Sequence, residues 1–270
     1  MTEPLLLAVD IGNSTVHIGL FAGETLEATW SLKTDTGFEC DDYGVALTVL
    51  FQRHGVDARD LGEGVIGSVV PPLTGVFESV LGEYCGLTPL VVRGGTRTGI
   101  RLMYDPLFEL GADRIAHAVA VDKLHGAPAI VVDFGTATSF DAIGKDSVYL
   151  GGAIAPGLTI AADALWRRTA QLQRIDLRIP ERAIGRNTAE AVQSGLILGH
   201  VGMTRDMIRR VGAEIEGAAH VIATGNHASL IAPHVPEIET VDCNLALQGL
   251  RLIYELNQIT PRRLEKTVHG

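Results

Sequence analysis

Cysteine is scarce in this sequence, and long apolar runs are missing. The 270 residues include three cysteines, Cys40, Cys85 and Cys243, and no two of them form a Cys-x-x-Cys pair. This usage argues against a disulfide framework or a structural zinc site and is typical of a reduced compartment. The apolar run at residues 5–9 is too short for a signal peptide and leads directly into Asp10. No run approaches the ~18 apolar residues of a membrane span. We therefore expect a soluble, cytoplasmic protein with no membrane partner.

Basic residues are outnumbered by acidic ones. The sequence has 22 Lys and Arg against 32 Asp and Glu, a formal net charge of −10, and an isoelectric point near 5.3. Nucleic-acid readers usually carry a basic face, because the phosphate backbone repels an acidic surface. We therefore expect no nucleic-acid partner.

Aromatic residues are few, at 5%, whereas hydrophobic residues reach 46% and glycine occurs 31 times. The mean hydropathy of +0.22 provides material for a sizeable core. This composition favours an aliphatic α/β protein with many tight turns. The length corresponds to one large domain or two lobes.

Several common motifs are absent. The sequence has no Gly-x-x-x-x-Gly-Lys-Ser/Thr loop and no Gly-x-Gly-x-x-Gly after a strand, which argues against two widespread nucleotide folds. Ser68 and Ser139 lack a nucleophile elbow. None of the nine histidines lies in a His-Glu-x-x-His motif, and we expect His117 and His125 to pack on a helix surface rather than bind metal.

Two segments share one pattern of apolar strand, aspartate, glycine, small polar residues and second apolar strand. They occupy residues 5–21, around Asp10, and residues 128–143, around Asp133. We expect the first turn to use positive φ, which Gly12 and Asn13 tolerate. The two aspartates lie 123 residues apart, close to half the chain. This spacing predicts duplication of one α/β unit, each copy presenting an acidic hairpin turn to a shared cleft.

The remaining pattern alternates strands and helices, as an α/β fold requires. We predict further strands at residues 30–34, 64–70, 89–93, 151–155 and 219–224. We predict helices at residues 40–54, 73–81, 113–125, 160–172, 188–211 and 246–256.

Three aspartates beside glycines, Asp10, Asp113 and Asp133, suit phosphoryl transfer without a phosphate loop. Carboxylates hold hard cations such as Mg²⁺, and glycine-rich turns expose N–H groups to phosphate oxygens. Hydroxyls such as those of Ser14 and Thr136 add donors to the same anion. The alternative is that each Asp-x-Gly merely turns a strand end. The repetition of the pattern favours the functional interpretation.

Five segments of the sequence resemble a known family, the type III pantothenate kinases of the acetate kinase, sugar kinase, Hsp70 and actin superfamily. The resemblance spans residues 5–257 in the family's order and spacing. It rests on LAVDIGNSTVHIGLF (7–21), YDPLFELGADR (104–114), VVDFGTATSFDAI (131–143), GGAIAPGL (151–158) and IGRNTAEAVQSG (184–195). The resemblance implies a homodimer that phosphorylates pantothenate with ATP, the first step of coenzyme A synthesis.

The resemblance also implies a duplicated ribonuclease H-like (actin-like ATPase) fold with the active site between two lobes. The lobes would be residues 1–117 and 118–258, followed by a polar tail at 259–270. Asp113 would be the general base, with Arg114 the electrostatic partner of the substrate. Asp133 would bind a monovalent cation, K⁺ or NH₄⁺, and Asp10 would organise Mg²⁺. ATP would bind at Asp10, Ile11, Gly12, Asn13, Ser14, Thr15, Val16, His17 and Thr136. Pantothenate would bind at Tyr104, Gly111, Ala112, Asp113, Arg114 and Thr188, with Thr188 near the dimer interface.

One departure from the family pattern concerns the nucleotide. Ala223-Thr224-Gly225-Asn226 stands where Thr-Gly-Gly is commoner near the adenosine. Asn adopts positive φ less readily than Gly, so we expect Asn226 to affect nucleotide affinity or base selectivity.

Two other functions remain open from the sequence alone. One is a non-catalytic, effector-binding regulatory dimer of the same fold, which the complete acidic set disfavours. The other is a kinase of the superfamily that acts on a sugar or a carboxylate, which the Gly-Ala-Asp-Arg context around Asp113 disfavours.

Overall fold

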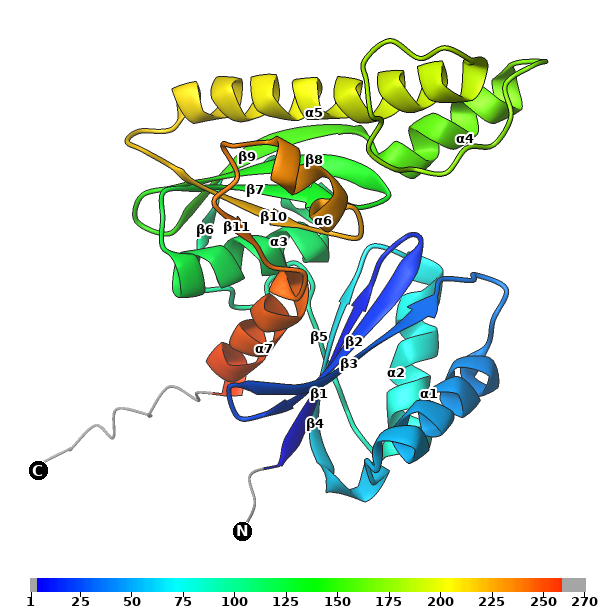
Figure 1. Ribbon diagram of the computed structural model, residues 1–270. Coiled ribbons are helices and arrows are strands. Elements are labelled where there is room, and N and C mark those ends of the chain that lie inside the picture. Colours follow the sequence, from blue (N-terminus) through cyan, green and yellow to red (C-terminus); the bar gives the residue numbers. More distant parts are fainter. Residues whose placement is uncertain (1–3, 259–270) are drawn as a thin grey trace, which may run out of the picture.

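The computed structural model describes residues 4–258, which form two lobes, each built on one β-sheet (Figure 1). The polar tail expected at 259–270 lies outside the described residues. Within 4–258, no helix is both long and apolar enough to cross a membrane.

The first lobe contains a five-stranded sheet in the order β3-β2-β1-β4-β5. The first three strands form an antiparallel meander, and β4 and β5 join it in parallel. Its strands are β1 (Leu5–Ile11), β2 (Thr15–Ala22), β3 (Thr25–Lys33), β4 (Leu61–Ser68) and β5 (Leu90–Val91).

The second lobe repeats this topology. Its sheet has the order β9-β8-β7-β10-β11, again an antiparallel meander followed by two parallel strands, and β6 is added beside β9. Its strands are β6 (Arg101–Leu102), β7 (Ala129–Phe134), β8 (Ala137–Gly144), β9 (Val148–Pro156), β10 (His220–Thr224) and β11 (Thr240–Val241). The matching strand orders confirm the predicted duplication and the ribonuclease H-like fold.

The helices follow equivalent positions in the two lobes. In the first lobe they are α1 (Cys40–His54), α2 (Pro71–Cys85) and α3 (Ala112–Ala120), which continues as a π-helical turn over Val121–His125. In the second lobe they are α4 (Leu158–Arg168), α5 (Thr188–Glu214), α6 (Ala228–Ile231) and α7 (Leu245–Gln258). Tyr43, Leu47 and Phe51 are buried on one face of α1, as their spacing of four residues predicts. Pro71 begins α2, where the missing N–H of proline costs nothing.

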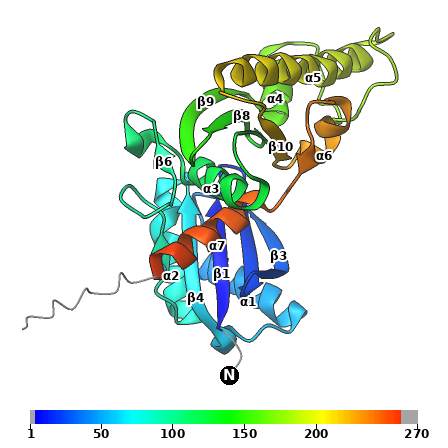
Figure 2. The same cartoon turned by 90° about the vertical axis from the view of Figure 1, so that its left-hand side faces the viewer.

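The chain does not divide between the sheets at residues 117 and 118, the boundary that the sequence predicts. The strand β6 precedes this boundary but pairs with β9 of the second sheet. The helix α7 follows it but packs across β1 and β4 of the first sheet and along α3 (Figure 2). The helices α3 and α7 are the last helices of the first and the second repeat. They pack against each other, and each buries apolar side chains of its partner helix. Leu247, Leu250 and Ile253 of α7 are buried in the same core cluster as Ile115 and Val119 of α3.

Candidate active site

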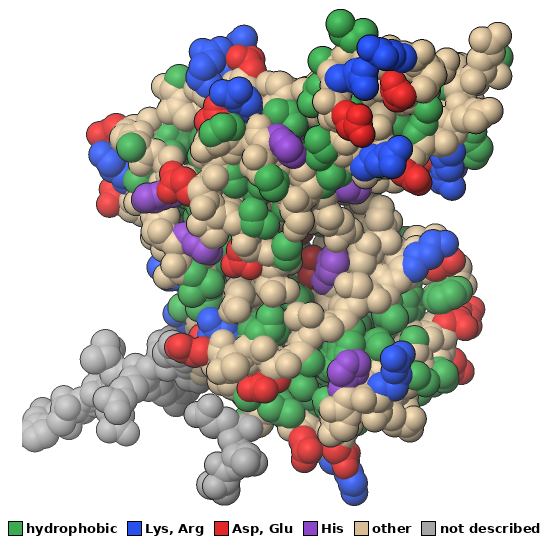
Figure 3. Space-filling model, viewed as in Figure 1, with side chains coloured by type: hydrophobic (Ala, Val, Ile, Leu, Met, Phe, Trp, Pro, Cys, Tyr) green, Lys and Arg blue, Asp and Glu red, His purple; other side chains and the backbone are tan. Residues whose placement is uncertain are grey.

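A cavity of about 590 Å³ lies between the lobes, within the usual size range of ligand sites. In the space-filling view the surface is hollowed at this level, with acidic and histidine side chains at its inner end (Figure 3). The turn between β1 and β2 enters it from one lobe, and the turn between β7 and β8 enters it from the other. The first turn of α3 supplies a third wall.

The first turn places Asp10 at the end of β1, directly opposite His17 on β2. The Gly12 N–H donates to the Thr15 carbonyl oxygen at 3.0 Å, and the Thr34 hydroxyl donates to the Gly12 carbonyl oxygen at 2.6 Å. The expectation of positive φ here is wrong, because neither Gly12 nor Asn13 has one. Space is tight at this glycine, since a Cβ would lie 3.0 Å from the Thr15 carbonyl oxygen.

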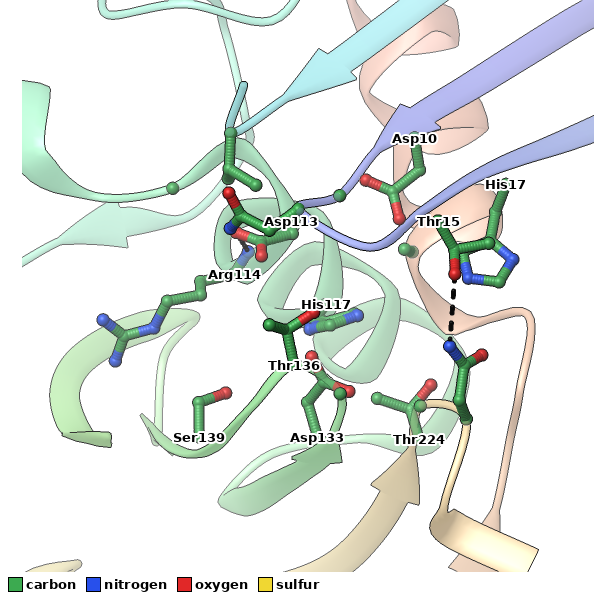
Figure 4. A pocket seen from close by; sticks show the side chains of 18 of the residues that line it. Asp10, Thr15, His17, Asp113, Arg114, His117, Asp133, Thr136, Ser139 and Thr224 are labelled. Atoms are coloured by element: carbon green, nitrogen blue, oxygen red, sulfur yellow. Dashed lines mark hydrogen bonds between the residues drawn. The ribbon is translucent and has the colours of Figure 1, made fainter. Parts of the chain in front are cut away.

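The second turn meets the first across the cavity. The hydroxyls of Ser14 and Thr136 are 2.7 Å apart. The Asn226 amide donates to the Thr15 hydroxyl at 3.5 Å, the bond drawn as a dashed line at Thr15 in Figure 4. Positive φ occurs at Gly225, where φ is 90°, and not at Asn226. The conformational reason for expecting Asn226 to weaken nucleotide binding therefore does not apply. A Cβ on Gly225 would lie 2.2 Å from the Asp133 carboxylate, so this turn packs directly under the acidic residue.

Asp10, Asp113 and Asp133 face one space, from β1, α3 and β7 respectively (Figure 4). Burial, together with the nearby charges of Asp113 and Asp133, raises the pKa of Asp10 to about 7. Burial, with Asp113 and Asp141 as further causes, raises the pKa of Asp133 to about 6. Ionisation of both carboxylates is therefore unfavourable in the protein alone, and a bound cation would favour their ionised forms.

His117 is the nearest partly compensating group. It lies one helical turn after Asp113 on α3, is 4% exposed and lines the cavity. Its electrostatic effect opposes the raised pKa values of Asp10 and Asp133. Its Nδ1 atom is buried without a hydrogen-bond partner among the described residues. The expectation that His117 packs on a helix surface is wrong, because this face of α3 is turned into the cavity.

The acidic cluster suits a cation that is shared with a phosphate ligand. Within residues 4–258, no three His, Cys, Asp or Glu side chains are close enough to hold an ion on their own. Mg²⁺ characteristically keeps several water ligands and binds through one or two carboxylates plus phosphate oxygens. The carboxylates present fit that mode, with their negative charge directed at the space between the two turns.

Asp113 and Arg114 lie in the first turn of α3, which begins at Ala112 after the N-cap Gly111. The Arg114 N–H donates to the Asp113 Oδ1 atom at 2.7 Å, which orients the carboxylate. The Arg114 side chain turns away from Asp10 and Asp133 (Figure 4) and pairs with Asp141 on β8, with 2.7 Å between Nε and Oδ1. Burial alone would lower the pKa of Arg114, but the Asp141 carboxylate more than reverses this effect and raises it.

Most of the sequence-predicted site residues line the cavity. They are Asp10, Gly12, Asn13, Ser14, Thr15, His17, Tyr104, Gly111, Asp113, Arg114, Asp133 and Thr136. Ile11 and Val16 do not, because they pair across β1 and β2 with side chains buried in the core of the first lobe. Ala112 is likewise buried, in the core cluster that contains α3 and α7. Thr188 is exposed at the first residue of α5 and is not part of the cavity wall.

Sequence reasoning missed two buried polar groups, His117 and Asp141. The signal for His117 is its spacing of four residues from Asp113 on one helix face. The signal for Asp141 is its alternation with Ser139 along β8, a strand whose other residues are apolar or small. Both Ser139 and Asp141 are buried.

Comparisons with known proteins point to one family. The type III pantothenate kinase family profile matches residues 6–210. A type III pantothenate kinase of Moorella thermoacetica is 46% identical over 253 residues, covering 94% of this chain and all of that protein. Another, from Thermomicrobium roseum, is 47% identical over 251 residues, covering 93% and 97% of the two chains.

Solved structures agree on the fold. A Campylobacter jejuni protein assigned to a Baf family of transcriptional activators superposes with a TM-score of 0.60 at 19% identity, covering 93% and 98% of the two chains. The polyphosphate/ATP-glucomannokinase of Arthrobacter sp. strain KM superposes with a TM-score of 0.50 at 13% identity, covering 94% and 100%. At such identities these likenesses concern the fold alone. The family match and the near-complete alignments at 46–47% identity show that this chain belongs to the type III pantothenate kinase family.

Proposed function

We propose that the protein transfers the γ-phosphoryl group of ATP to pantothenate and forms 4′-phosphopantothenate, the first step of coenzyme A biosynthesis. The observation that carries this proposal is the meeting of Asp10, Asp113 and Asp133 in one cavity between two opposed hairpin turns. Membership of the type III pantothenate kinase family supports the choice of substrate.

The ATP phosphates bind between the two turns. The backbone N–H groups of the turn after Asp10, and the hydroxyls of Ser14 and Thr136, donate to phosphate oxygens. These two hydroxyls contact each other across the cavity. A bound phosphate replaces this contact and accepts hydrogen bonds from both hydroxyls. The adenosine lies on the side of the second lobe that contains Thr224, Gly225 and Asn226.

Asp113 is the general base. Its carboxylate accepts the proton of the primary hydroxyl of pantothenate while the hydroxyl oxygen attacks the γ-phosphorus and the bond to the β,γ-bridging oxygen breaks. Tyr104, Gly111 and Arg114 surround this position and hold the acceptor. The Arg114 N–H bond to the Asp113 carboxylate keeps one of its oxygens in place and leaves the other free to accept.

Two cations are expected beside the phosphates. Asp10 holds Mg²⁺, directly or through water, and Asp133 holds a monovalent cation, K⁺ or NH₄⁺. When bound, the cations offset the charge that accumulates between the carboxylates and the phosphates. The raised pKa values of Asp10 and Asp133 support this assignment, because both carboxylates lack a full counter-charge in the protein alone.

A coupled assay of ADP release tests the proposal. We expect turnover that requires pantothenate, ATP and Mg²⁺, and that rises when KCl or NH₄Cl replaces NaCl at equal ionic strength. Absence of pantothenate-dependent turnover under all of these salts would contradict the proposed function. Turnover that is indifferent to the monovalent cation would contradict only the role of Asp133.

A non-catalytic regulatory role is not favoured. A regulator of this fold has no need for a general base or a cation ligand, yet all three carboxylates line the cavity.

We also propose that the protein acts as a homodimer in the cytoplasm. The dimer would account for Thr188, which is exposed and lies outside the cavity of the single chain.

A further inference from the structure

A buried polar network lies behind the wall of the cavity that holds Arg114. At its centre is Asp141, whose side chain is completely buried. Its Oδ1 atom lies 2.7 Å from Arg114 Nε, 2.6 Å from Arg114 Nη2 and 2.7 Å from the Tyr149 hydroxyl, which donates to it. The Ser139 hydroxyl donates to Oδ2 at 3.3 Å. A buried carboxylate is stable only with such partners, and Asp141 has them.

The network holds the Arg114 guanidinium in one place. Its central carbon lies 5.6 Å from the centre of the Tyr104 ring and 5.8 Å from that of the Tyr149 ring. The two rings and the carboxylate together restrict the rotamers of a side chain that is flexible when free. Arg114 is also the only Lys or Arg among the described residues that line the cavity.

The ion pair between Arg114 and Asp141 connects two different secondary-structure elements. Asp141 belongs to β8 of the second sheet, whereas Arg114 belongs to the first turn of α3, next to Asp113. The Arg114 backbone N–H in turn orients the Asp113 carboxylate. Displacement of the Arg114 side chain would therefore disturb the wall of the acceptor site and the first turn of α3 together.

We propose that Asp141 is a positioning residue, which acts through Arg114 to hold the acceptor side of the cavity and the first turn of α3 in their working arrangement. This inference rests on the proposed kinase function for its substrate. The pairing also affects how the acceptor is recognised, because the charges of Arg114 and Asp141 cancel. Arg114 contributes directed N–H groups to the acceptor site and little net positive charge.

The test compares Asp141→Asn with a matched control, Asp122→Asn. Asp122 has a side chain that is 7% exposed, with one cation, Lys123, and one hydroxyl, Ser147, as partners, but it does not line the cavity. For Asp141→Asn we expect kcat/KM for pantothenate to fall on the order of 10²-fold, because small misplacements of a reacting pair have effects of this size. We expect the KM for ATP to stay within about threefold of the wild-type value, since the phosphate turns are not touched. Asp122→Asn should leave both constants close to wild type.

Hydrogen exchange gives a second readout that needs no turnover. Amides at the start of α3, residues 112–116, should exchange faster in Asp141→Asn than in Asp122→Asn or the wild type. If Asp141→Asn does not fold, Asp141→Glu and Tyr149→Phe replace it. The first keeps the charge but displaces it, and the second removes one hydrogen bond to Asp141 while leaving the Arg114 pair in place. We expect a larger loss of kcat/KM for pantothenate in Asp141→Glu than in Tyr149→Phe.

The outcomes separate the two proposals. A wild-type protein without pantothenate turnover overturns the proposed function, and exchange at the start of α3 then still decides the role of Asp141. A folded Asp141→Asn protein that matches Asp122→Asn in kcat/KM and in exchange overturns the positioning role. An equal loss of activity in Asp141→Asn and Asp122→Asn also overturns the positioning role, because a general loss of stability would then explain the effect.

Discussion

At the scale of single residues, the site separates three carboxylates by their surroundings. Asp10, which is buried, and Asp133, which is half-buried, sit at strand ends close to like charges, and their pKa values are raised to about 7 and about 6. Asp113 sits in the first turn of α3, where a backbone N–H orients its carboxylate. These surroundings suit two cation ligands and one proton acceptor. Distinct tasks for chemically similar groups are a common property of active sites.

Replacement of the proposed general base, Asp113, gives the most direct residue-scale prediction. We expect Asp113→Asn to lower kcat on the order of 10²–10⁴-fold, because the amide cannot accept the proton of the attacking hydroxyl. The variant should still bind ATP, since Asp113 lies on the acceptor side. Steady-state kinetics measures the first effect and a nucleotide-binding titration the second. Wild-type kcat in this variant would remove Asp113 from the mechanism.

The raised pKa values predict how stability depends on pH. Between about pH 4 and pH 7 the folded protein binds more protons at Asp10 and Asp133 than the unfolded chain does. The free energy of unfolding of the ligand-free protein therefore falls as pH rises through this window, by roughly 1 kcal/mol per pH unit for each group. A cation bound at the cluster, as we propose, would reverse this loss, and we expect it to bind better when the carboxylates are ionised.

Thermal unfolding with a dye or by circular dichroism checks this prediction. At pH 8, K⁺ or Mg²⁺ should raise Tm relative to a low-salt reference, and at pH 5 the increase should be much smaller. Asp10→Asn should weaken the pH dependence, because one of the two titrating groups is gone. Equal cation effects at pH 5 and pH 8 would contradict an ionised acidic cluster as the cation site.

The sequence is sufficient to predict the three aspartates but not their neighbours. Asp10 and Asp133 share a local pattern, and a repeated pattern is visible without coordinates. His117 has no repeated pattern to mark it, and its only signal is the spacing of four residues from Asp113 on a helix that is buried on nearly all sides. That spacing indicates the cavity-facing side of the helix only once Asp113 is taken as a site residue. Asp141 lies within a family motif, but its role is hidden because its partner Arg114 lies 27 residues away and on another element.

At the scale of secondary-structure elements, the helices α7 and α3 cross with their backbones in close contact at Gly249. A Cβ on Gly249 of α7 would lie 1.9 Å from the Ala116 carbonyl oxygen of α3, so only glycine permits this crossing. Both helices lie beside the cavity, and α3 carries Asp113 at its first turn. The crossing therefore sets the distance between the first sheet and the proposed general base.

A pair of glycine substitutions tests this packing. We expect Gly249→Ala to lower the free energy of unfolding by at least about 1–3 kcal/mol, the range of ordinary overpacking, because the contact is with backbone that cannot turn aside. Gly75→Ala in α2 is the control, since nothing lies within 4 Å of its Cβ position. It should raise stability by about 0.5–1 kcal/mol through helix propensity alone. Denaturant titrations of both proteins measure the difference, and a neutral Gly249→Ala would contradict the close crossing of α7 and α3.

Most elements could be predicted from apolar periodicity, whereas their ends depend on turns. The strand expected at residues 30–34 is β3, Thr25–Lys33, because a turn at Gly23, with φ of 58°, starts it earlier. The helix expected at 160–172 is α4, Leu158–Arg168, and the extended backbone of Thr169 ends it. The predicted division of the chain at residue 117 missed the exchange of β6 and α7 between lobes, because such exchange depends on which surfaces meet in three dimensions.

At the scale of the whole molecule, duplication explains how an acidic protein binds anionic substrates. Two copies of one sheet topology face their acidic turns toward each other across a single cavity. The net charge of −10 would be countered there locally, by backbone N–H groups and by the cations that we propose for the carboxylates. Most of the exposed basic side chains lie elsewhere. The segment from Arg167 to Arg186, for example, contains six arginines and joins α4 to α5.

The same end of the second lobe exposes large apolar side chains. Ile160, Leu165 and Trp166 of α4 are 37–45% exposed, and Ile184, in the segment before α5, is 81% exposed. Figure 1 places α4 and this segment together at one end of the molecule. Large apolar side chains that are exposed near one another commonly mark a contact with another chain. The homodimer that we propose would cover these side chains and bring a second chain close to Thr188.

Sedimentation velocity with two charge substitutions tests this interface. We expect the wild-type protein to sediment as a dimer, and Ile184→Glu to raise the dimer dissociation constant by at least about tenfold, because a carboxylate would be buried in an apolar contact. Phe108→Glu is the matched control: Phe108 is 83% exposed but belongs to the short 3₁₀ helix Leu107–Glu109 between β6 and α3, in the first half of the chain. It should leave the dimer intact. Equal dissociation by the two substitutions, or a wild-type monomer at assay concentrations, would contradict a dimer through the α4 end. If the dimer completes the acceptor site, Ile184→Glu should also raise the KM for pantothenate while leaving the KM for ATP unchanged, since the ATP-binding turns belong to a single chain.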